Sequence, residues 1–392
     1  MGDLTCFNGA VILAGDNLDA VRGKALIIQE GRIVEIGDAP AGACLMDLSG
    51  MLLCPAFVNA HTHVGDTGAK ELGIGLPLTQ AVDPPEGLKH VFLQKVTGTE
   101  SHLAMMRHGL GEMQRNGTAA VADFREGGLA GVRALRKAAE GIPIRVVALG
   151  RISEGGSGEA AYGEACALLE EADGIGFRDV EAIPEGLAAR LKRACPSKIF
   201  AAHAGEDLTC EQRSQAVTGK GQAGRLADWG PDFLVHLVHT SAGELKVLAE
   251  HGIRGVACPR SNGVLGDGLP RLAGWVQQGL RFGLGTDNVM FNSPDLFREM
   301  DYASRMTRGV EGDSTAIDSR LILQAATIEG ARALRLDADL GSLAPGKEAT
   351  FLAIDLNRPN LTYQQDVISA LVHRASPADI ASMYVRGERV NG

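Results

Sequence analysis

The run TAAVADF (residues 118–124), followed by LAGVRALRKAA (129–139) and RVVALGR (145–151), decides the fold class. The first and third runs are short and apolar, which is typical of buried strands. The middle run has the length and the apolar spacing of an amphipathic helix. A strand, a helix and a second strand in this order form a βαβ unit, which favours a parallel sheet.

The same alternation continues in both directions along the chain. We predict strands at Ala56–His61, Thr118–Phe124, Arg145–Arg151, Gly174–Val180, Lys198–His203, Phe233–His239, Gly255–Pro259 and Arg281–Thr286. The helices predicted between them include Leu129–Ala139, Ala160–Glu171, Glu185–Ala194, Ala242–Glu250 and Leu272–Gln278. Eight strands separated by helices predict an α/β protein, a (β/α)8 TIM barrel.

The two ends of the chain have a different sequence pattern from the middle. Near the N-terminus, Ala25–Ile28 and Ile33–Ile36 flank a Gly31-Arg32 turn, which is typical of a β-hairpin. Further strand-like runs occur at Ala349–Ile354 and Met383–Gly387. We therefore predict a discontinuous small β-sandwich domain from residues 1–54 and 345–392, and a barrel from residues 55–344.

Composition excludes several classes of partner. The net charge of −10, with no cluster of Lys and Arg, argues against nucleic acid and anionic membranes as partners. No apolar stretch reaches the roughly 18 residues of a membrane helix, and we expect no secretory signal. The seven cysteines are scattered, without a C-x-x-C pair, which favours reduced thiols in the cytoplasm. We expect a small-molecule substrate.

Reactive side chains follow the predicted strands, at the end of a barrel where active sites gather. His61 and His63 lie two residues apart and therefore point to one side of an extended chain, as a metal clamp requires, although such a pair also occurs by chance. His203 could instead be a core histidine, and Asp287 a helix N-cap. Together, three imidazoles and one carboxylate form a metal site with room for water.

The sixth predicted strand carries two histidines, His236 and His239. Their three-residue spacing means that they do not share a face of a strand. Spacing alone does not choose between them.

Several motifs carry a family resemblance. PAFVNAHTH (55–63) resembles the first-strand motif of the amidohydrolase superfamily, and HAGE (203–206) resembles the H-x-x-E motif of its deaminase and chlorohydrolase branch. That branch includes cytosine, guanine, adenosine and S-adenosylhomocysteine deaminases and the triazine hydrolases. Further matches are HLVH (236–239), CPRSN (258–262), GTDN (285–288) and GSLAPGKEA (341–349). The resemblance covers essentially the whole chain in the right order.

The resemblance implies roles for individual residues. His61, His63, His203 and Asp287 would hold one divalent metal ion, for which zinc suits the donors best and iron or manganese are alternatives. Glu206, His236 and Asp287 would be catalytic: Glu206 shuttles protons, His236 assists the attacking water, and Asp287 takes the proton of that water. No lysine ends the fourth predicted strand, where binuclear relatives carry a carboxylated lysine, so we expect one metal ion.

The resemblance also implies the reaction. We expect hydrolytic deamination of an amino-substituted heterocycle (a nucleobase, nucleoside or pterin) by metal-activated water, with release of ammonia. The alternative on the same mononuclear site is hydrolysis of another C–N or C–Cl bond, in a cyclic amide, an N-acyl compound or a triazine. A third class is a catalytically silent barrel that serves as a binding module. A homodimer is expected from the family.

Substrate contacts are predicted from loops. A long stretch without strong periodicity, from residue 64 to about residue 90, is typical of a lid or binding loop. In it Lys89 and His90 could reach the substrate, although loop lysines are more often solvated. The remaining candidates follow strands: Arg125, Arg151, Arg260 and Asn288. The arginines could bind a carboxylate, a phosphate or a polar ring edge, or could pair with neighbours such as Glu126.

Overall fold

The parallel strands predicted in the middle of the chain form one nine-stranded sheet in the computed structural model, which describes residues 4–153 and 158–390. Its strands are β8 (Phe57–His63), β9 (Thr118–Arg125), β10 (Arg145–Gly150), β11 (Gly174–Phe177), β12 (Ile199–Ala204), β13 (Phe233–His236), β14 (Arg254–Ala257), β15 (Phe282–Leu284) and β16 (Asp287–Asn288). Each strand from β8 to β15 pairs in parallel with the next along the chain.

The sheet closes on itself through its last two strands. β15 pairs with β14 at one edge, and β16 pairs with β8 at the other. The two follow each other with only Gly285 and Thr286 between them and together take one position in the barrel wall, so the predicted TIM barrel is confirmed. The two strands are split because Asn59, and not a neighbouring strand, bonds Thr286: its Oδ1 accepts the Thr286 amide at 3.0 Å, and its amide donates to the Thr286 hydroxyl at 2.8 Å.

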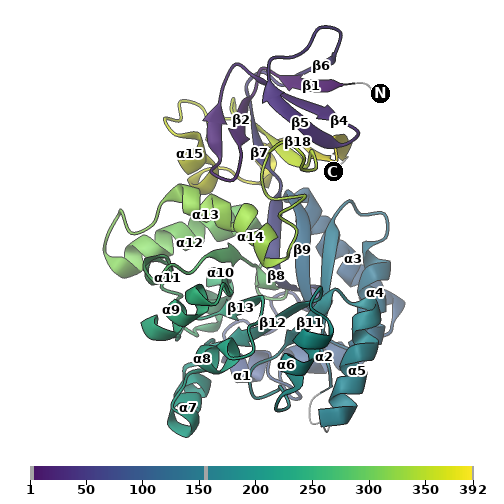
Figure 1. Cartoon of the computed structure of the whole chain (residues 1–392), viewed down its shortest axis with the longest axis vertical. Coiled ribbons are helices and arrows are strands. Elements are labelled where there is room, and N and C mark those ends of the chain that lie inside the picture. Colours follow the sequence, from purple (N-terminus) through teal and green to yellow (C-terminus); the bar gives the residue numbers. More distant parts are fainter. Residues whose placement is uncertain (1–3, 154–157, 391–392) are drawn as a thin grey trace.

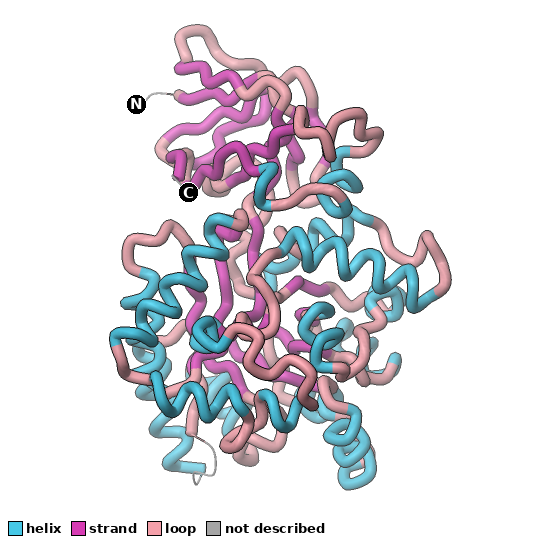
Figure 2. Tube along the Cα trace, turned by 180° about the vertical axis from the view of Figure 1, so that it is seen from behind, coloured by secondary structure: helices cyan, strands magenta, loops and turns pink. Residues whose placement is uncertain are grey.

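Helices surround the barrel, as the two opposite views show (Figures 1 and 2). They are α3 (Glu100–Arg115), α4 (Gly128–Ala139), α5 (Gly158–Glu171), α6 (Leu187–Ala194), α7 (Leu208–Thr218), α8 (Gln222–Ala227), α9 (Ala242–Glu250), α10 (Pro259–Leu265), α11 (Leu272–Gln277), α12 (Leu296–Glu311), α13 (Ser319–Ala325) and α14 (Ile328–Ala333). Among the described residues, none of the helices combines the length and the apolar character that crossing a membrane requires.

The segment of residues 64–96 is more ordered than its sequence suggests. It contains the 3-10 helix η1 (Val64–Ala69) and the helices α1 (Leu78–Ala81) and α2 (Leu88–Val96). The periodicity was hard to recognise because α1 is a single turn and α2 buries only Lys89 and Leu93. The predicted long loop therefore contains η1, α1 and the start of α2, and Lys89 belongs to the first turn of α2.

Both chain ends contribute strands to a small β region at one end of the molecule, where the purple and yellow strands lie side by side (Figure 1). One sheet has the order β5-β4-β1-β6, and the other has the order β19-β18-β17-β7-β2-β3. The N-terminal strands are β1 (Thr5–Asn8), β2 (Val11–Ala14), β3 (Asp19–Val21), β4 (Ala25–Gln29), β5 (Arg32–Gly37), β6 (Cys44–Asp47) and β7 (Met51–Pro55). The C-terminal strands are β17 (Phe351–Asp355), β18 (Ile380–Val385) and β19 (Glu388–Val390), with α15 (Val367–His373) and the 3-10 helix η2 (Pro377–Asp379) between β17 and β18.

The joint between the two chain ends is the antiparallel pairing of β7 with β17. Phe7, Phe351 and Tyr384 pack their rings together between the sheets, with centroids 4.7–5.1 Å apart. Only Ala56 separates β7 from β8, so the small region passes directly into the first strand of the barrel. The division of the chain at residues 54/55 and 344/345 stays a prediction.

Candidate metal centre and catalytic pocket

Four side chains converge at the carboxyl ends of the barrel strands. His61 and His63 come from β8, His203 from β12 and Asp287 from β16. The Nε2 atom of His61 lies 3.2 Å from Asp287 Oδ1 and 3.3 Å from His203 Nε2, and His63 Nε2 lies 3.6 Å from Asp287 Oδ1. All four residues are at most 8% exposed. The structure thus brings together the four ligands that the sequence predicts.

Contacts on the far side of two rings orient them for metal binding. The Nδ1 atom of His63 donates to the carbonyl of Phe124 at 3.1 Å, and His203 Nδ1 donates to the carbonyl of Arg178 at 2.8 Å. A proton on Nδ1 leaves the lone pair of Nε2 directed inward, which is the state that a metal ligand needs.

The protonation states also suit a cation. Burial lowers the pKa of His63 to about 3, and burial likewise lowers the pKa of His61 and of His203. Burial opposes ionisation of Asp287, but the hydrogen bond from His61 and the neighbouring imidazoles hold its pKa well below its usual range. Three neutral nitrogens and one carboxylate at these separations fit a divalent metal ion.

The backbone at Asp287 is fixed in an uncommon conformation. Its φ is +59°, in the left-handed region that residues with a side chain rarely adopt. The turn aims Oδ1 at the histidines, while Oδ2 accepts a 2.5 Å hydrogen bond from the hydroxyl of Ser261. Asp287 caps no helix in the structure: the helices that follow begin at other caps, such as Asp295 for α12.

A second pair of groups adjoins the four predicted ligands. Glu206 Oε1 lies 3.4 Å from His236 Nε2, and the Asn262 amide donates to His236 Nδ1 at 3.1 Å. The ring of His236 stacks on that of His203, with centroids 5.4 Å apart. Burial, together with the charge of Asp287, raises the pKa of Glu206 well above its ordinary value. A carboxyl group that keeps its proton can act as a general acid.

The structure distinguishes the two histidines that spacing could not. β13 ends at His236, and left-handed backbone at His236 and Leu237 then turns the chain away. His239 consequently points elsewhere, and its Nε2 donates to the carbonyl of Asp267 at 2.6 Å. Only His236 of the two lines the pocket.

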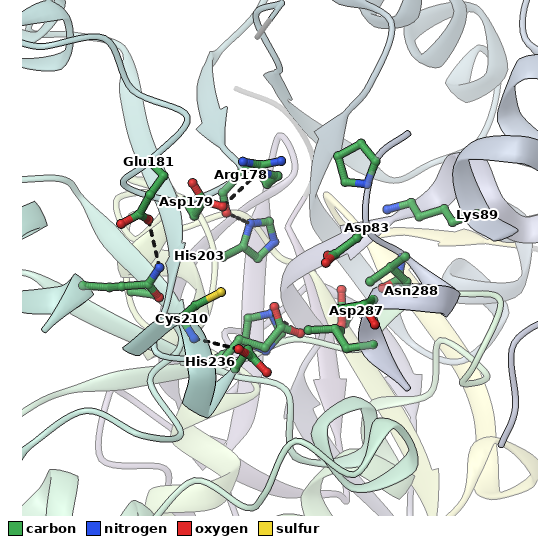
Figure 3. A pocket seen from close by; sticks show the side chains of 18 of the residues that line it. Asp83, Lys89, Arg178, Asp179, Glu181, His203, Cys210, His236, Asp287 and Asn288 are labelled. Carbon is green, nitrogen blue, oxygen red and sulfur yellow. Dashed lines mark hydrogen bonds and ion pairs between the residues drawn. The ribbon is translucent and has the colours of Figure 1, made fainter. Parts of the chain in front are cut away.

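The pocket is a cavity of about 280 Å³. Its inner wall contains His63, His203, His236, Asp287 and Glu206. Its outer wall is built from three places in the chain: Leu78, Thr79, Val82, Asp83 and Pro84 around α1, Arg178, Asp179 and Glu181 after β11, and Asp207, Cys210 and Arg213 around α7. Figure 3 shows Glu181 and Cys210 on one side and Lys89 and Asn288 on the other, with His203 between them.

Four of the six predicted substrate contacts line the pocket: Lys89, His90, Arg151 and Asn288. Lys89 is not a solvated loop lysine, because the residue is 3% exposed and its ammonium group pairs with Glu126 at 2.8 Å. The Nε atom of Arg151 is buried without a hydrogen-bond partner among the described residues. These four groups are placed where a bound molecule would meet them.

Arg125 and Arg260 are not brought to the pocket. Arg125 is buried behind it, paired with Glu126 and lying 3.4 Å from Asp123, which is the ion pairing that the sequence left open. Arg260 donates to the carbonyl of Ser293 at 3.1 Å and lies 3.6 Å from Glu299. Both guanidiniums are held by neighbouring side chains and backbone, and neither lines the cavity.

Sequence reasoning missed the outer wall beyond β11. The fourth strand was predicted to run from Gly174 to Val180, but it ends at Phe177. Arg178 and Asp179 therefore follow the strand, and both line the pocket. The change from an apolar run to a charged pair after Phe177 was the available signal. Gln222 at the start of α8 was also missed. Its Oε1 accepts the Gly205 amide at 2.9 Å, and this bond fixes the turn before Glu206.

Comparison with known proteins gives a consistent result. The sequence profile of the amidohydrolase family matches residues 52–390. A protein of Methanothermobacter thermautotrophicus, provisionally named an aminohydrolase, is 38% identical over 317 residues, which are 79% of this chain and 82% of the relative. A 5-methylthioadenosine/S-adenosylhomocysteine deaminase of Desulforudis audaxviator is 29% identical over 396 residues, covering 93% of this chain and 88% of the relative.

Among solved structures, a zinc-containing adenosine deaminase of Xanthomonas campestris superposes with a TM-score of 0.86 and 22% identity. The match covers 99% of this chain and 92% of that structure. At this identity the likeness shows a shared fold.

Proposed function

Because the chain is an enzyme of the amidohydrolase family, we propose that it is a hydrolytic deaminase that releases ammonia from an amino-substituted heterocycle of the nucleobase, nucleoside or pterin type. The observation that carries this proposal is the position of Glu206, a proton donor beside His236, in the pocket that three of the four proposed metal ligands also line. Deamination needs both parts, since the departing amine must be protonated while water attacks the carbon that bears it.

The cofactor is a divalent metal ion, which we propose to be a single zinc ion held by His61, His63, His203 and Asp287. Three imidazoles and one carboxylate are a donor set that suits zinc. When bound, the ion supplies Lewis acidity, which makes water acidic enough to act as a nucleophile near neutral pH. β11 is followed by Arg178 and not by a lysine, which agrees with a single ion.

The chain itself provides the proton transfers. Glu206, with its raised pKa, donates its proton to a ring nitrogen of the substrate. It then takes a proton from the hydroxyl of the tetrahedral intermediate and passes it to the departing amine, and the water proton held by Asp287 returns to Glu206 at the end of the cycle. Asp287 is ionised and can take the proton of the attacking water. His236 is held by Asn262 and presents Nε2 toward the site, where it orients that water. His236 and Asp287 are at most 2% exposed, which keeps bulk water from competing for their hydrogen bonds.

The named relatives support a nucleoside-like substrate. A relative that matches nearly the whole chain is called a 5-methylthioadenosine/S-adenosylhomocysteine deaminase. The outer wall offers Arg178, Asp179 and Arg213 to a polar substituent of the ring. We therefore expect a substrate that carries a hydrophilic group on the heterocycle.

The test is ammonia release by metal-analysed protein across a panel of amino-heterocycles, nucleosides and pterins. We expect ammonia from one compound class, abolished by a chelator and restored by zinc. If no compound of this panel releases ammonia, but a cyclic amide, an N-acyl compound or a chlorotriazine is hydrolysed, deamination is overturned and the alternative reaction is established. Zinc-loaded protein that hydrolyses none of these compounds would favour the silent barrel. Cytoplasmic location and assembly as a homodimer stay predictions.

A further inference from the structure

Glu126 lies directly behind a metal ligand. It follows the last residue of β9, and its Oε1 is 3.2 Å from Nδ1 of His63. The same nitrogen donates to the carbonyl of Phe124 at 3.1 Å, so the His63 ring faces two acceptors. A carboxylate in this position can stabilise the positive charge that a histidine gains when its other nitrogen binds a metal.

Two cations flank this carboxylate. Lys89 Nζ is 2.8 Å from Glu126 Oε1, and Arg125 pairs with Oε2. The side chains of Lys89 and Arg125 are 4% and 2% exposed. Burying an ammonium group is costly unless a partner compensates it, and Glu126 is the only ion-pair partner of Lys89 within 4 Å among the described residues. Because desolvation offsets much of the attraction in a buried ion pair, a positioning role explains this contact better than a gain in stability.

The contact also joins two distant parts of the chain. Lys89 lies in the first turn of α2, within the 64–96 segment that forms part of the pocket wall. His63 belongs to the barrel itself. The contacts from Lys89 to Glu126 and from Glu126 to His63 thus link a helix that lines the pocket to the proposed metal ligands.

We propose that Glu126 is a positioning residue for the metal ligand His63, and that Lys89 couples the docking of α2 to metal binding through it. The proposal rests on the metal site, and not on the reaction, proposed above. A metal ion that fixes His63 should fix Glu126 and with it α2. By reciprocity, loss of the α2 contact should weaken metal binding by the same factor by which metal stabilises docked α2.

The first experiment measures the zinc dissociation constant of metal-free protein by competition with a chromophoric chelator. Glu126→Gln keeps the shape of the side chain but removes its charge, and we expect zinc binding to weaken by about 10–100-fold. Lys89→Met keeps the aliphatic stem and should weaken binding in the same direction by less.

Lys70→Met is the matched control. Lys70 lies in the same segment and pairs with Glu112 at 3.0 Å, but its side chain is 48% exposed and does not line the pocket. We expect no change in its zinc affinity. Thermal unfolding of each metal-free variant separates a lost fold from a lost ligand orientation.

The second experiment measures amide hydrogen exchange in residues 78–96, which needs no variant at position 126. In the wild type, zinc should slow this exchange, and in Lys89→Met the slowing should be lost although zinc still binds. The proposal would be overturned if zinc left the exchange rate of these amides unchanged in the wild type. It would also be overturned if folded Glu126→Gln bound zinc with an affinity within twofold of wild type. Failure of the wild type to bind any divalent metal would overturn the proposed metal site, and this inference with it.

Discussion

The inner and outer walls of the pocket are built on different principles. On the inner wall, His63 and His203 come from barrel strands and are at most 8% exposed, and backbone carbonyls hold both rings. On the outer wall, the side chains of Arg178 and Asp179 are 31% and 26% exposed and pair with each other. The inner wall is therefore set before any substrate arrives, whereas the outer wall can adjust to one. We expect changes to the inner wall to alter turnover or metal binding, and changes to the outer wall to alter KM.

The largest effect should come from Glu206→Gln. The amide cannot donate the proton that the Glu206 carboxyl holds, and a positioned general acid is typically worth about 10²–10⁴ in rate. We expect kcat to fall within that range while bound metal stays at the wild-type level, as measured by steady-state kinetics and elemental analysis. Activity close to wild type would remove Glu206 from the inner wall's chemistry.

The next effect separates two histidines only three residues apart. His236→Gln removes the group beside Glu206 and should lower kcat by about 10²-fold or more, because His236 acts in the same proton-transfer machinery. His239→Gln removes a bond to the backbone of Asp267, outside the pocket, and should leave kcat within a few-fold of wild type. The assignment would be reversed if His239→Gln proved to be the more damaging variant.

A smaller effect is expected from replacing Arg151. Arg151 lines the pocket and has an unpaired buried Nε, so Arg151→Met should raise KM by roughly 10-fold, the value of one charge-assisted hydrogen bond. Bound metal should not change. Arg260→Met is the control, since Arg260 contacts Ser293 and Glu299 and not the pocket. Equal KM values for wild type and Arg151→Met would exclude Arg151 from substrate binding.

The smallest effect concerns Asp267 and the pH dependence of the protein's stability. Burial, together with nearby Glu206 and Asp207, raises the pKa of Asp267 to about 8. The native state therefore keeps a proton that the unfolded chain releases above its ordinary pKa of about 3.9, so this residue lowers stability as pH rises from about 4 to 8. Asp267→Asn cannot ionise, and its Tm advantage over the wild type should grow between pH 5 and pH 8 in metal-free protein. A difference in Tm that is independent of pH would contradict the assignment.

The sequence predicted the inner wall well because strand periodicity and strand ends determine it. His61 and His63 alternate along β8, and His203 and Asp287 each fall where a strand meets the barrel mouth. These positions depend on the local backbone, which short apolar runs report directly. The split between β15 and β16 could not be predicted, because it depends on Asn59, more than two hundred residues away in the chain.

The roles of the charged residues around the pocket were harder to predict because tertiary contacts determine them. Lys89 was predicted as a possible substrate contact, with a solvated loop lysine as the alternative, because its partner Glu126 follows β9 and is adjacent to it only in the folded barrel. Arg125 looked like a substrate contact, but Asp123 and Glu126 engage it behind the pocket. A charged residue beside a strand end can either contact the substrate or form an ion pair within the protein. Only the positions of its partners in the folded chain decide between these two roles.

The central claim is that His61, His63, His203 and Asp287 hold one metal ion. Anomalous diffraction at the zinc edge, from crystals of zinc-loaded protein, tests it most directly. We predict one strong peak per chain at about 2.0–2.2 Å from the Nε2 atoms of the three histidines and from a carboxylate oxygen of Asp287. The buried groups would also allow another set, His61, His236 and Asp287. A peak held by that set, or no peak in this pocket, would contradict the account.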